Sequence, residues 1–233
     1  MNNVSLDNIT TFNDLGCRFY QIPTDTSTYT YPSITSMLGN TQCEKKRDIL
    51  ARWRDRMGHE KADAFTAEAA RRGTAVHWLL EQYFDGVSLS DIDYSTASTD
   101  DITAFKSVIK FNAKNVSKVY RQETALFSHA LQIAGRVDLV GEWKGVPAII
   151  DFKTSGRLKD DEDIEDYWLQ ITFYAIAHNE MFGTNIDRGV IMMSVKNSLP
   201  QVWCHDDLLI RYGEKLLNRI DQFYEVLNNA TAA

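Results

Sequence analysis

The pattern of apolar and polar residues predicts helices toward both ends of the chain and strands mainly in its middle. Apolar positions three or four apart predict helices over residues 43–57, 62–84, 101–118, 167–182 and 206–228. Runs rich in β-branched residues predict strands over residues 119–127, 188–195 and 201–204, and a hairpin over residues 135–155. This mixture predicts an α/β protein in which helices cover a sheet.

The chain before residue 32 is polar, with a Thr- and Ser-rich run over residues 24–30. We expect residues 1–31 to form a loosely docked arm or at most a short hairpin. Pro32 and Ser33 then mark a capped helix start. We expect residues 32–233 to form a single domain, with a helical part over about 32–117 and a sheet core over about 118–233.

Three charged residues interrupt the apolar runs of the predicted hairpin. Asp138 lies in the first strand, and Asp151 and Lys153 lie two residues apart in the second. Because successive side chains of a strand point to opposite faces, Asp151 and Lys153 are expected on one face, with Asp138 at the same edge of the sheet. Aspartate is disfavoured within strands, so the pattern favours a functional site, with a hairpin carrying surface charges as the alternative.

The chemistry of these three side chains favours metal-dependent cleavage of a phosphodiester bond. Carboxylate oxygens are the hard ligands that Mg²⁺ or Mn²⁺ prefers, and a cation between them removes their mutual repulsion. A lysine beside such a cation can orient or deprotonate a water molecule, or neutralise charge that develops on a phosphate. Two carboxylates and one ammonium group are the combination that this hydrolysis requires.

The composition is ordinary for a soluble globular protein, with 44% hydrophobic and 24% charged residues. No apolar run approaches the roughly 20 residues of a membrane span. The first eleven residues resemble neither a signal peptide nor an arginine-rich transit peptide, so we expect a cytoplasmic location and no membrane partner. Cys17, Cys43 and Cys204 are widely spaced, which indicates neither a disulfide framework nor a zinc site.

The net charge of −7 hides a local excess of basic residues. Residues 43–72 contain nine basic and six acidic side chains, so this segment carries +3 and the remainder of the chain −10. A local basic surface can bind nucleic acid although the whole protein is acidic. The alternative is that these basic residues form a solvated helix face.

The hairpin resembles the active-site core of the PD-(D/E)XK nuclease superfamily, in which an Asp on one strand is followed by Asp/Glu-x-Lys on the next. The proline of that signature is absent, because Val137 precedes Asp138. The chain instead resembles the RecB-like branch, which includes phage and mitochondrial exonucleases. The motifs that carry this resemblance are, in order, Pro32-Ser33-Ile34-Thr35, Arg52-Trp53-Arg54, Gly73-x-x-x-His77, Gly135-x-x-Asp138, Asp151-x-Lys153-Thr154-Ser155 and Gln170-x-x-x-Tyr174.

The resemblance implies a central mixed β-sheet flanked by helices, with an N-terminal helical part, and it assigns roles to the motif residues. The implied catalytic residues are Asp138, Asp151, Lys153, Gln170 and Tyr174. One or two Mg²⁺ or Mn²⁺ ions would be held by His77, Asp138, Asp151 and the backbone carbonyl of Phe152, with Glu123 as a further candidate. Contacts to DNA would come from Arg52, Trp53, Arg54, Arg56, Arg72, Thr154 and Ser155. Some relatives carry an iron-sulfur cluster held by four cysteines, which the three cysteines of this chain cannot form.

We therefore expect a metal-dependent DNA exonuclease that prefers single-stranded ends and acts in replication, recombination or repair, encoded by a phage. One alternative is a structure-specific endonuclease on the same core. A second is an inactive core that only binds DNA, and a third is an α/β protein unrelated to nucleic acid. Taken without the resemblance, His77 could be a packed helical residue and Glu123 an exposed edge carboxylate.

Overall fold

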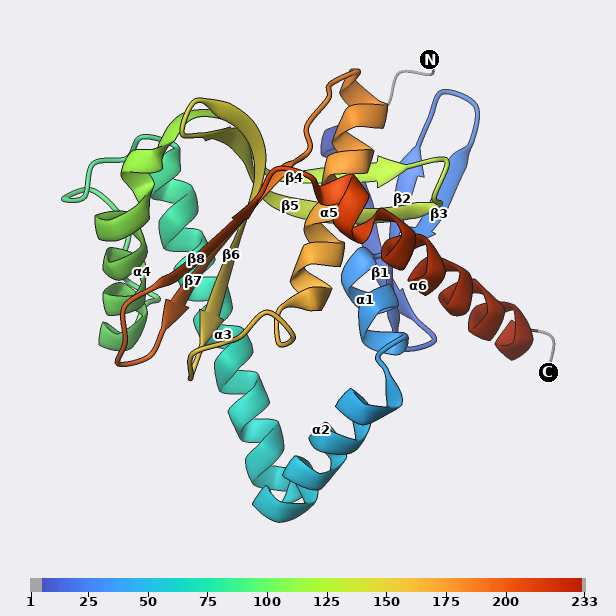
Figure 1. Cartoon of the computed structure of the whole chain (residues 1–233), viewed down its shortest axis with the longest axis horizontal. Coiled ribbons are helices and arrows are strands. Elements are labelled where there is room, and N and C mark those ends of the chain that lie inside the picture. The colour runs from blue at the N-terminus through green and yellow to red at the C-terminus, as the bar shows by residue number, and fades with distance from the viewer. Residues whose placement is uncertain (1–5, 232–233) are drawn as a thin grey trace.

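The computed structural model describes residues 6–231, and this part of the chain contains two β-sheets and six α-helices (Figure 1). The strands are β1 (Thr10–Asp14), β2 (Cys17–Pro23), β3 (Thr28–Pro32), β4 (Val116–Ser128), β5 (Ile133–Trp143), β6 (Val146–Ser155), β7 (Arg188–Val195) and β8 (Gln201–His205). The helices are α1 (Ile34–Asn40), α2 (Glu44–Met57), α3 (His59–Phe84), α4 (Thr99–Asn112), α5 (Glu165–Phe182) and α6 (Leu208–Thr231). Short 3₁₀ turns span Leu6–Asn8 and Ala113–Asn115.

The central sheet has the strand order β4-β5-β6-β7-β8. Its neighbouring strands are antiparallel except β6 and β7, which are parallel. Parallel neighbours need a crossover connection, and α5 lies in the segment that joins β6 to β7. The mixed sheet flanked by helices confirms the predicted fold class.

Different helices cover the two faces of the central sheet (Figure 1). α5 and α6 pack on one face, where they meet Ile149 and Ile191. α3 and α4 pack on the other face, where they meet Ile150 and Val190. Adjacent residues of β6 therefore enter opposite cores, as the alternation along a strand requires. Burial on both faces is typical of a strand with a parallel neighbour.

The segment before α1 forms a three-stranded antiparallel sheet that packs on the central sheet. Tyr20 and Ile22 of β2 are buried beside Phe127 of β4 and Ala134 of β5. Ser33, which follows β3 and caps α1, forms an isolated bridge with Ala134. This differs from the loosely docked arm or short hairpin that we expected for residues 1–31, because the apolar residues of β2 cover a core. Residues 1–5 lie outside the described range.

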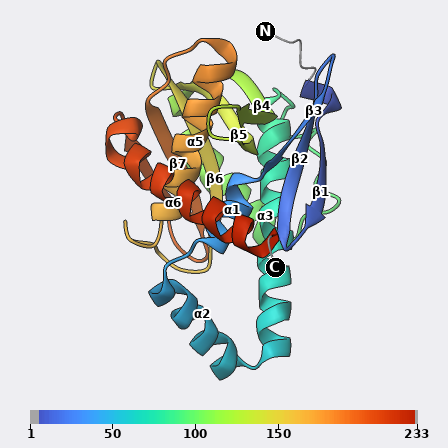
Figure 2. The same cartoon turned by 90° about the vertical axis from the view of Figure 1, so that its right-hand side faces the viewer.

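α2 and the first half of α3 form a helical hairpin that projects from the body of the protein, and we call it the α2–α3 hairpin (Figure 2). No residue of α2 is buried. Ile49 and Leu50, which helical spacing places with Trp53 on one apolar face, are 54% and 49% exposed. That face has no core to enter, because α2 packs mainly beside α3.

Two further elements differ from prediction. The helix expected over residues 101–118 ends at Asn112, and β4 begins at Val116 after a 3₁₀ turn. In α6, Leu209 and Leu217 are 39% and 48% exposed, so the buried face of this helix is narrower than the apolar spacing suggested. Within residues 6–231, none of the helices combines the length and apolar character that crossing a bilayer needs.

Candidate active site

The candidate site lies where strands β5 and β6 separate. Their pairing extends to Leu139 and Ile150. Beyond this pair, the backbone amide of Phe152 donates a hydrogen bond to Asp138 Oδ2 at 2.7 Å. The side chain of Asp138 thus replaces a strand partner, and the separation of the strands leaves its carboxylate beside a cleft.

Three residues from three elements offer ligand atoms at this point. His77 of α3, Glu123 of β4 and Asp138 of β5 each present a nitrogen or carboxylate oxygen, and these atoms all lie within 4.8 Å of one another. His77 Nδ1 is 3.5 Å from Asp138 Oδ1, and its Nε2 lies 2.9 Å from the carbonyl oxygen of Phe152. The structure therefore brings the predicted ligands His77, Asp138 and Phe152 O together with Glu123.

Glu123 is held in this group by an unusual backbone conformation. Its neighbours Gln122 and Thr124 pair with Leu139 and Val137, so Glu123 lies opposite Asp138. Its φ of 43° is in the left-handed region, which non-glycine residues rarely adopt outside turns. Burial, followed by the nearby charge of Asp138, raises the pKa of Glu123 to about 7.

Asp151 lies outside this group of three and is the most buried carboxylate of the predicted site, with 1% exposure. Neither of its oxygens accepts a well-oriented hydrogen bond, although Lys153 Nζ lies 2.6 Å from Oδ2. The pKa of Asp151 is raised to about 6, because burial raises it, Lys153 opposes this rise and Asp138 adds to it. Burial also opposes the charge of Lys153, but Asp151 and Asp138 outweigh it, so the pKa of the ammonium group is raised.

Helix α5 holds Lys153 from the opposite side. Gln170 Oε1 is 3.4 Å from Lys153 Nζ, and Gln170 Nε2 donates to the hydroxyl of Tyr174 at 3.0 Å. The ring of Tyr167 lies 5.0 Å from the same Nζ, within cation–π range. Burial raises the pKa of Tyr174 well above its ordinary value, so this phenol stays protonated.

Gly135 gives Tyr174 the space to reach this position. A Cβ at residue 135 would lie 2.8 Å from Tyr174 Cε1 and 2.9 Å from Ile34 Cγ2. The glycine of Gly73-x-x-x-His77 differs, because a Cβ there would meet nothing within 4 Å. Gly73 instead lines the cleft, where a side chain would occupy part of the open space.

These residues surround a cleft of about 500 Å³ that opens to solvent, and we call it the catalytic cleft. The predicted residues His77, Glu123, Asp138, Lys153, Gln170 and Tyr174 line it. It is also lined by residues that the sequence did not reveal, namely Arg18, Tyr20, Trp78, Glu81 and Arg136. Arg18 and Tyr20 belong to β2, which was expected in a short hairpin at most. Trp78 is 43% exposed, so a base can stack on its ring. Helical spacing from His77 could have indicated Glu81.

The residues predicted to contact DNA have different environments. Arg52 and Arg56 are exposed on α2, whereas Arg54 pairs with Asp63 at 2.7 Å. The ring of Trp53 packs edge-on against Phe65, with centroids 5.7 Å apart, so less of it is open to a base.

The remaining predicted DNA contacts also differ from one another. The hydroxyl of Ser155 donates to Arg157 O at 2.6 Å and accepts from Arg157 N at 3.2 Å, so a local turn occupies it. Thr154 is half-buried. Arg72 does not line the catalytic cleft but a separate pocket beside α4.

Comparison with known families identifies this arrangement. The sequence model of the PD-(D/E)XK nuclease superfamily matches residues 50–201, well over half of the chain. The chain belongs to the PD-(D/E)XK nuclease superfamily. The matched range contains His77, Glu123, Asp138, Asp151 and Lys153, the residues from which the site is built.

Curated relatives named mitochondrial genome maintenance exonuclease 1 are also similar to the chain. The protein from Xenopus tropicalis is 27% identical over 203 residues, covering 83% of this chain and 57% of that protein. The human protein is 26% identical over 208 residues, covering 85% of this chain and 59% of that protein. The chain thus spans about three fifths of the length of these relatives. A solved structure from Eubacterium rectale has a TM-score of 0.46 and 15% identity, covering 68% of each chain.

Proposed function

We propose that this protein is a metal-dependent exonuclease that hydrolyses phosphodiester bonds of DNA and prefers single-stranded ends. The observation that carries the proposal is the convergence of His77, Glu123 and Asp138 beside the buried pair of Asp151 and Lys153. Such a group of carboxylates and one imidazole stabilises nothing by itself, because the carboxylates repel one another and lose hydration. A cation and a phosphate would compensate both costs.

The donor atoms fit a divalent cation. Oxygen ligands favour Mg²⁺ or Mn²⁺, and the three carboxylates of Glu123, Asp138 and Asp151 outnumber the single ammonium group of Lys153, which leaves negative charge to be neutralised. His77, Glu123, Asp138 and the carbonyl of Phe152 would hold the cation, with Asp151 beside them. A bound cation would polarise the scissile phosphate and lower the pKa of a water molecule.

The protein's own side chains would orient the reacting groups. Lys153 keeps its charge because Asp151 and Asp138 outweigh its burial, so it can position a water molecule or stabilise charge on the phosphate. Gln170 limits the movement of Lys153 through its Oε1, and Tyr174 in turn accepts a hydrogen bond from Gln170. Arg18 and Arg136 at the cleft would neutralise the phosphates on either side of the scissile bond.

The preference for single-stranded ends rests on two features. Trp78 offers an exposed ring at the catalytic cleft, and stacking on a ring requires bases that are not paired. The curated relatives are named exonucleases. We further propose that the protein is phage-encoded and acts in the host cytoplasm during DNA replication, recombination or repair.

A cleavage assay tests the proposal. Purified protein with Mg²⁺ or Mn²⁺ is offered linear single-stranded, linear duplex and circular single-stranded DNA, beside Lys153→Ala and a chelator control. Short products from the linear single strand alone, lost in both controls, are expected. Cutting of the circle would contradict the exonuclease and favour an endonuclease, whereas a gel shift without cleavage would favour a module that only binds DNA.

A further inference from the structure

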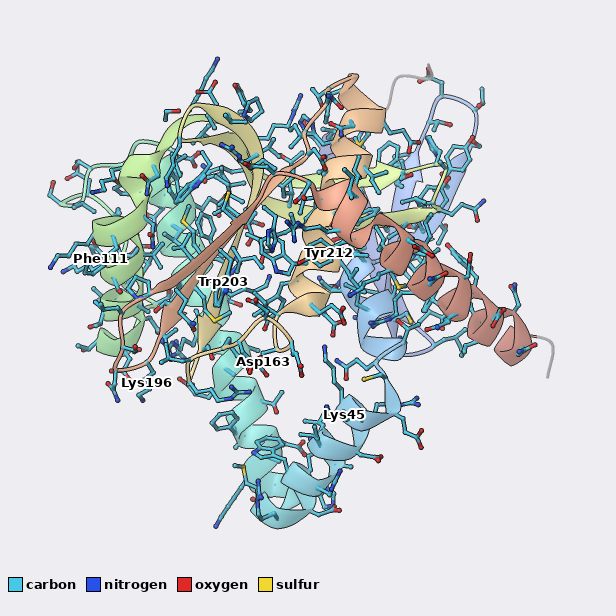
Figure 3. The ribbon with its side chains drawn as sticks, in the orientation of Figure 1. Lys45, Phe111, Asp163, Lys196, Trp203 and Tyr212 are labelled. Atoms are coloured by element: carbon cyan, nitrogen blue, oxygen red, sulfur yellow. The ribbon has the colours of Figure 1, made fainter. Side chains whose placement is uncertain are left out.

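A second pocket lies on the other side of α3 from the catalytic cleft. We call it the α3–α4 pocket; its volume is about 410 Å³, and it lies between α3, α4 and the turn after β7. Arg72, Ser107, Ser194 and Lys196 line it, together with Asp100. Figure 3 marks Lys196 at the end of β7, on the side of the molecule that carries α4. No role in the proposed catalysis uses this pocket.

One donor in the α3–α4 pocket is buried and lacks a partner. Arg72 Nε is inaccessible to solvent and makes no hydrogen bond within the described part of the chain. Ser194, which also lines the pocket, is 1% exposed. A buried polar group without a partner costs about 1–3 kcal/mol, and buried polar groups normally have one. The unpartnered guanidinium nitrogen at this pocket therefore points to a bound ligand.

The charge of the pocket indicates an anion. Arg72 and Lys196 supply two cationic groups, and the hydroxyls of Ser107 and Ser194 can both donate hydrogen bonds. The only carboxylate among the lining residues is that of Asp100, which is exposed and lies 3.2 Å from Lys196 Nζ. A guanidinium group with hydroxyl donors suits phosphate oxygens. The catalytic cleft, in contrast, contains several carboxylates and suits a cation.

The position of the pocket relates it to the reaction. Ser194 pairs with Thr154 in the parallel ladder of β6 and β7, whereas Asp151 pairs with Ile191. Three residues separate these pairs, which is about 10 Å at a rise of about 3.3 Å per residue. By alternation from Ile149 and Val190, Asp151 faces α5 and Ser194 faces α3 and α4, so a nucleic acid strand that reaches both sites would pass around the end of β6.

We propose that the α3–α4 pocket binds a backbone phosphate of the nucleic acid substrate, beyond the scissile bond. This inference rests on the proposed function, since it assumes that the substrate is a polynucleotide. Arg72 would supply its Nε and the charge, and Ser107 and Ser194 would donate hydrogen bonds. The pocket would hold the strand in register with the catalytic residues without contacting a base, so the contact would not depend on sequence.

The test measures binding of a labelled single-stranded oligonucleotide by fluorescence anisotropy at several salt concentrations. The full chain carries Asp138→Asn in all samples, so that the DNA is not cut. Arg72→Gln is expected to weaken binding about 10-fold and to reduce the salt slope by about 0.7, the contribution of one phosphate of a single strand. Lys106→Gln, an exposed basic residue of α4 outside the pocket, is the matched control and should change neither value by as much.

Ser194→Ala separates a binding role from a structural one and also serves if Arg72→Gln does not fold. Because Ser194→Ala removes one hydroxyl and little volume, the melting temperature should change little, while DNA binding weakens about 3-fold. A lower melting temperature with unchanged DNA binding would assign Ser194 to packing and overturn the proposal.

The remaining outcomes distinguish this proposal from the proposed function. If the wild type neither cuts nor binds DNA, the proposed function itself is wrong. If it cuts DNA while Arg72→Gln and Ser194→Ala bind normally, only the phosphate site is wrong. If inorganic phosphate raises the melting temperature through Arg72 but DNA binding is unchanged, the pocket takes a free anion, and its assignment to the strand is overturned.

Discussion

Strand β6 and helix α2 place charged residues in opposite environments. Asp151 of β6 is 1% exposed and has lost its water, so its charge lowers the stability of the fold. The charged residues of α2 face solvent or pair at the surface, where a charge costs little and contributes little. A charged group that lowers the stability of the fold is a stronger indication of function than one that has little effect on it. The exchanges below extend this comparison from the buried site to more exposed or less tightly packed positions, the first two through activity and binding and the last two through stability.

The largest effect is expected from Asp138→Asn. The amide oxygen can still accept the hydrogen bond from Phe152 N, so the fold should persist, but one negative charge is lost from the cation site. We expect single-turnover cleavage to fall by at least about 10²–10³-fold, with little change in melting temperature. Glu142→Gln, an exchange of another carboxylate on β5 outside the catalytic cleft, is the control. Near-normal cleavage by Asp138→Asn would remove this carboxylate from the site.

The second exchange compares two tryptophans. Trp78→Ala removes an exposed ring from the catalytic cleft, and stacking of one base is worth about 1–3 kcal/mol, so affinity for single-stranded DNA should fall by about 5–150-fold. Trp53→Ala removes a ring that packs against Phe65, so it should loosen the α2–α3 hairpin and affect binding less. Binding titrations and hydrogen exchange of α2 measure the two effects. The reverse order of affinities would place the stacking surface on the hairpin.

The third pair of exchanges compares two glycines of the sequence motifs through their effect on stability. Gly135→Ala forces a methyl group against Tyr174 and Ile34, which should lower the free energy of unfolding by about 1–3 kcal/mol. The methyl group of Gly73→Ala would meet no atom within 4 Å, and alanine is the better residue within a helix. This exchange should therefore raise the free energy of unfolding by about 0.5–1 kcal/mol. Urea titration of both variants measures the difference. Equal destabilisation by both would mean that α3 is as tightly packed as the sheet.

The smallest effect concerns pH. The pKa of Glu123 is raised to about 7, so the native state retains a proton that the unfolded state releases near pH 4.5. Stability contributed by this proton is present at low pH and is lost as the pH rises through about 7. In chelator, the melting temperature of the wild type should therefore fall relative to Glu123→Gln as the pH rises from 5 to 8. We expect the difference in melting temperature between the two proteins to change by about 2–4 °C, a value reduced to allow for the partial exposure of Glu123. A difference that does not change across this pH range would contradict the raised pKa. Added Mg²⁺ should make the change smaller.

The sequence predicted the central sheet well because both its periodicity and its chemistry are local. Asp151 and Lys153 lie two apart in an apolar run, so their shared face follows from alternation alone. The crowding of His77, Glu123 and Asp138 follows from the order of the strands and the position of α3, which the motifs imply only through the resemblance. Glu123 in particular depends on a left-handed backbone that no sequence pattern indicated.

Prediction from the sequence was wrong where tertiary packing, rather than the local pattern of residues, decides what is buried. The segment that contains β2 was expected to be a loosely docked arm or at most a short hairpin, but Tyr20 and Ile22 are buried because β4 and β5 pack against them. Helical spacing gives α2 an apolar face, but no residue of α2 is buried, and among the described elements this helix packs mainly beside α3. A hydrophobic pattern predicts that a face can be buried, and the rest of the fold decides whether it is.

The parallel pairing of β6 with β7 has a consequence for the order in which the chain acquires its structure. During synthesis, β4, β5 and β6 can form their hairpins as they emerge, because each connection is short. Strand β7 follows only after α5, more than thirty residues later, which takes about 2–7 s at about 5–20 residues per second. Asp151 can therefore stay hydrated on a growing chain while local structure forms, and its desolvation is completed only when β7 closes the sheet.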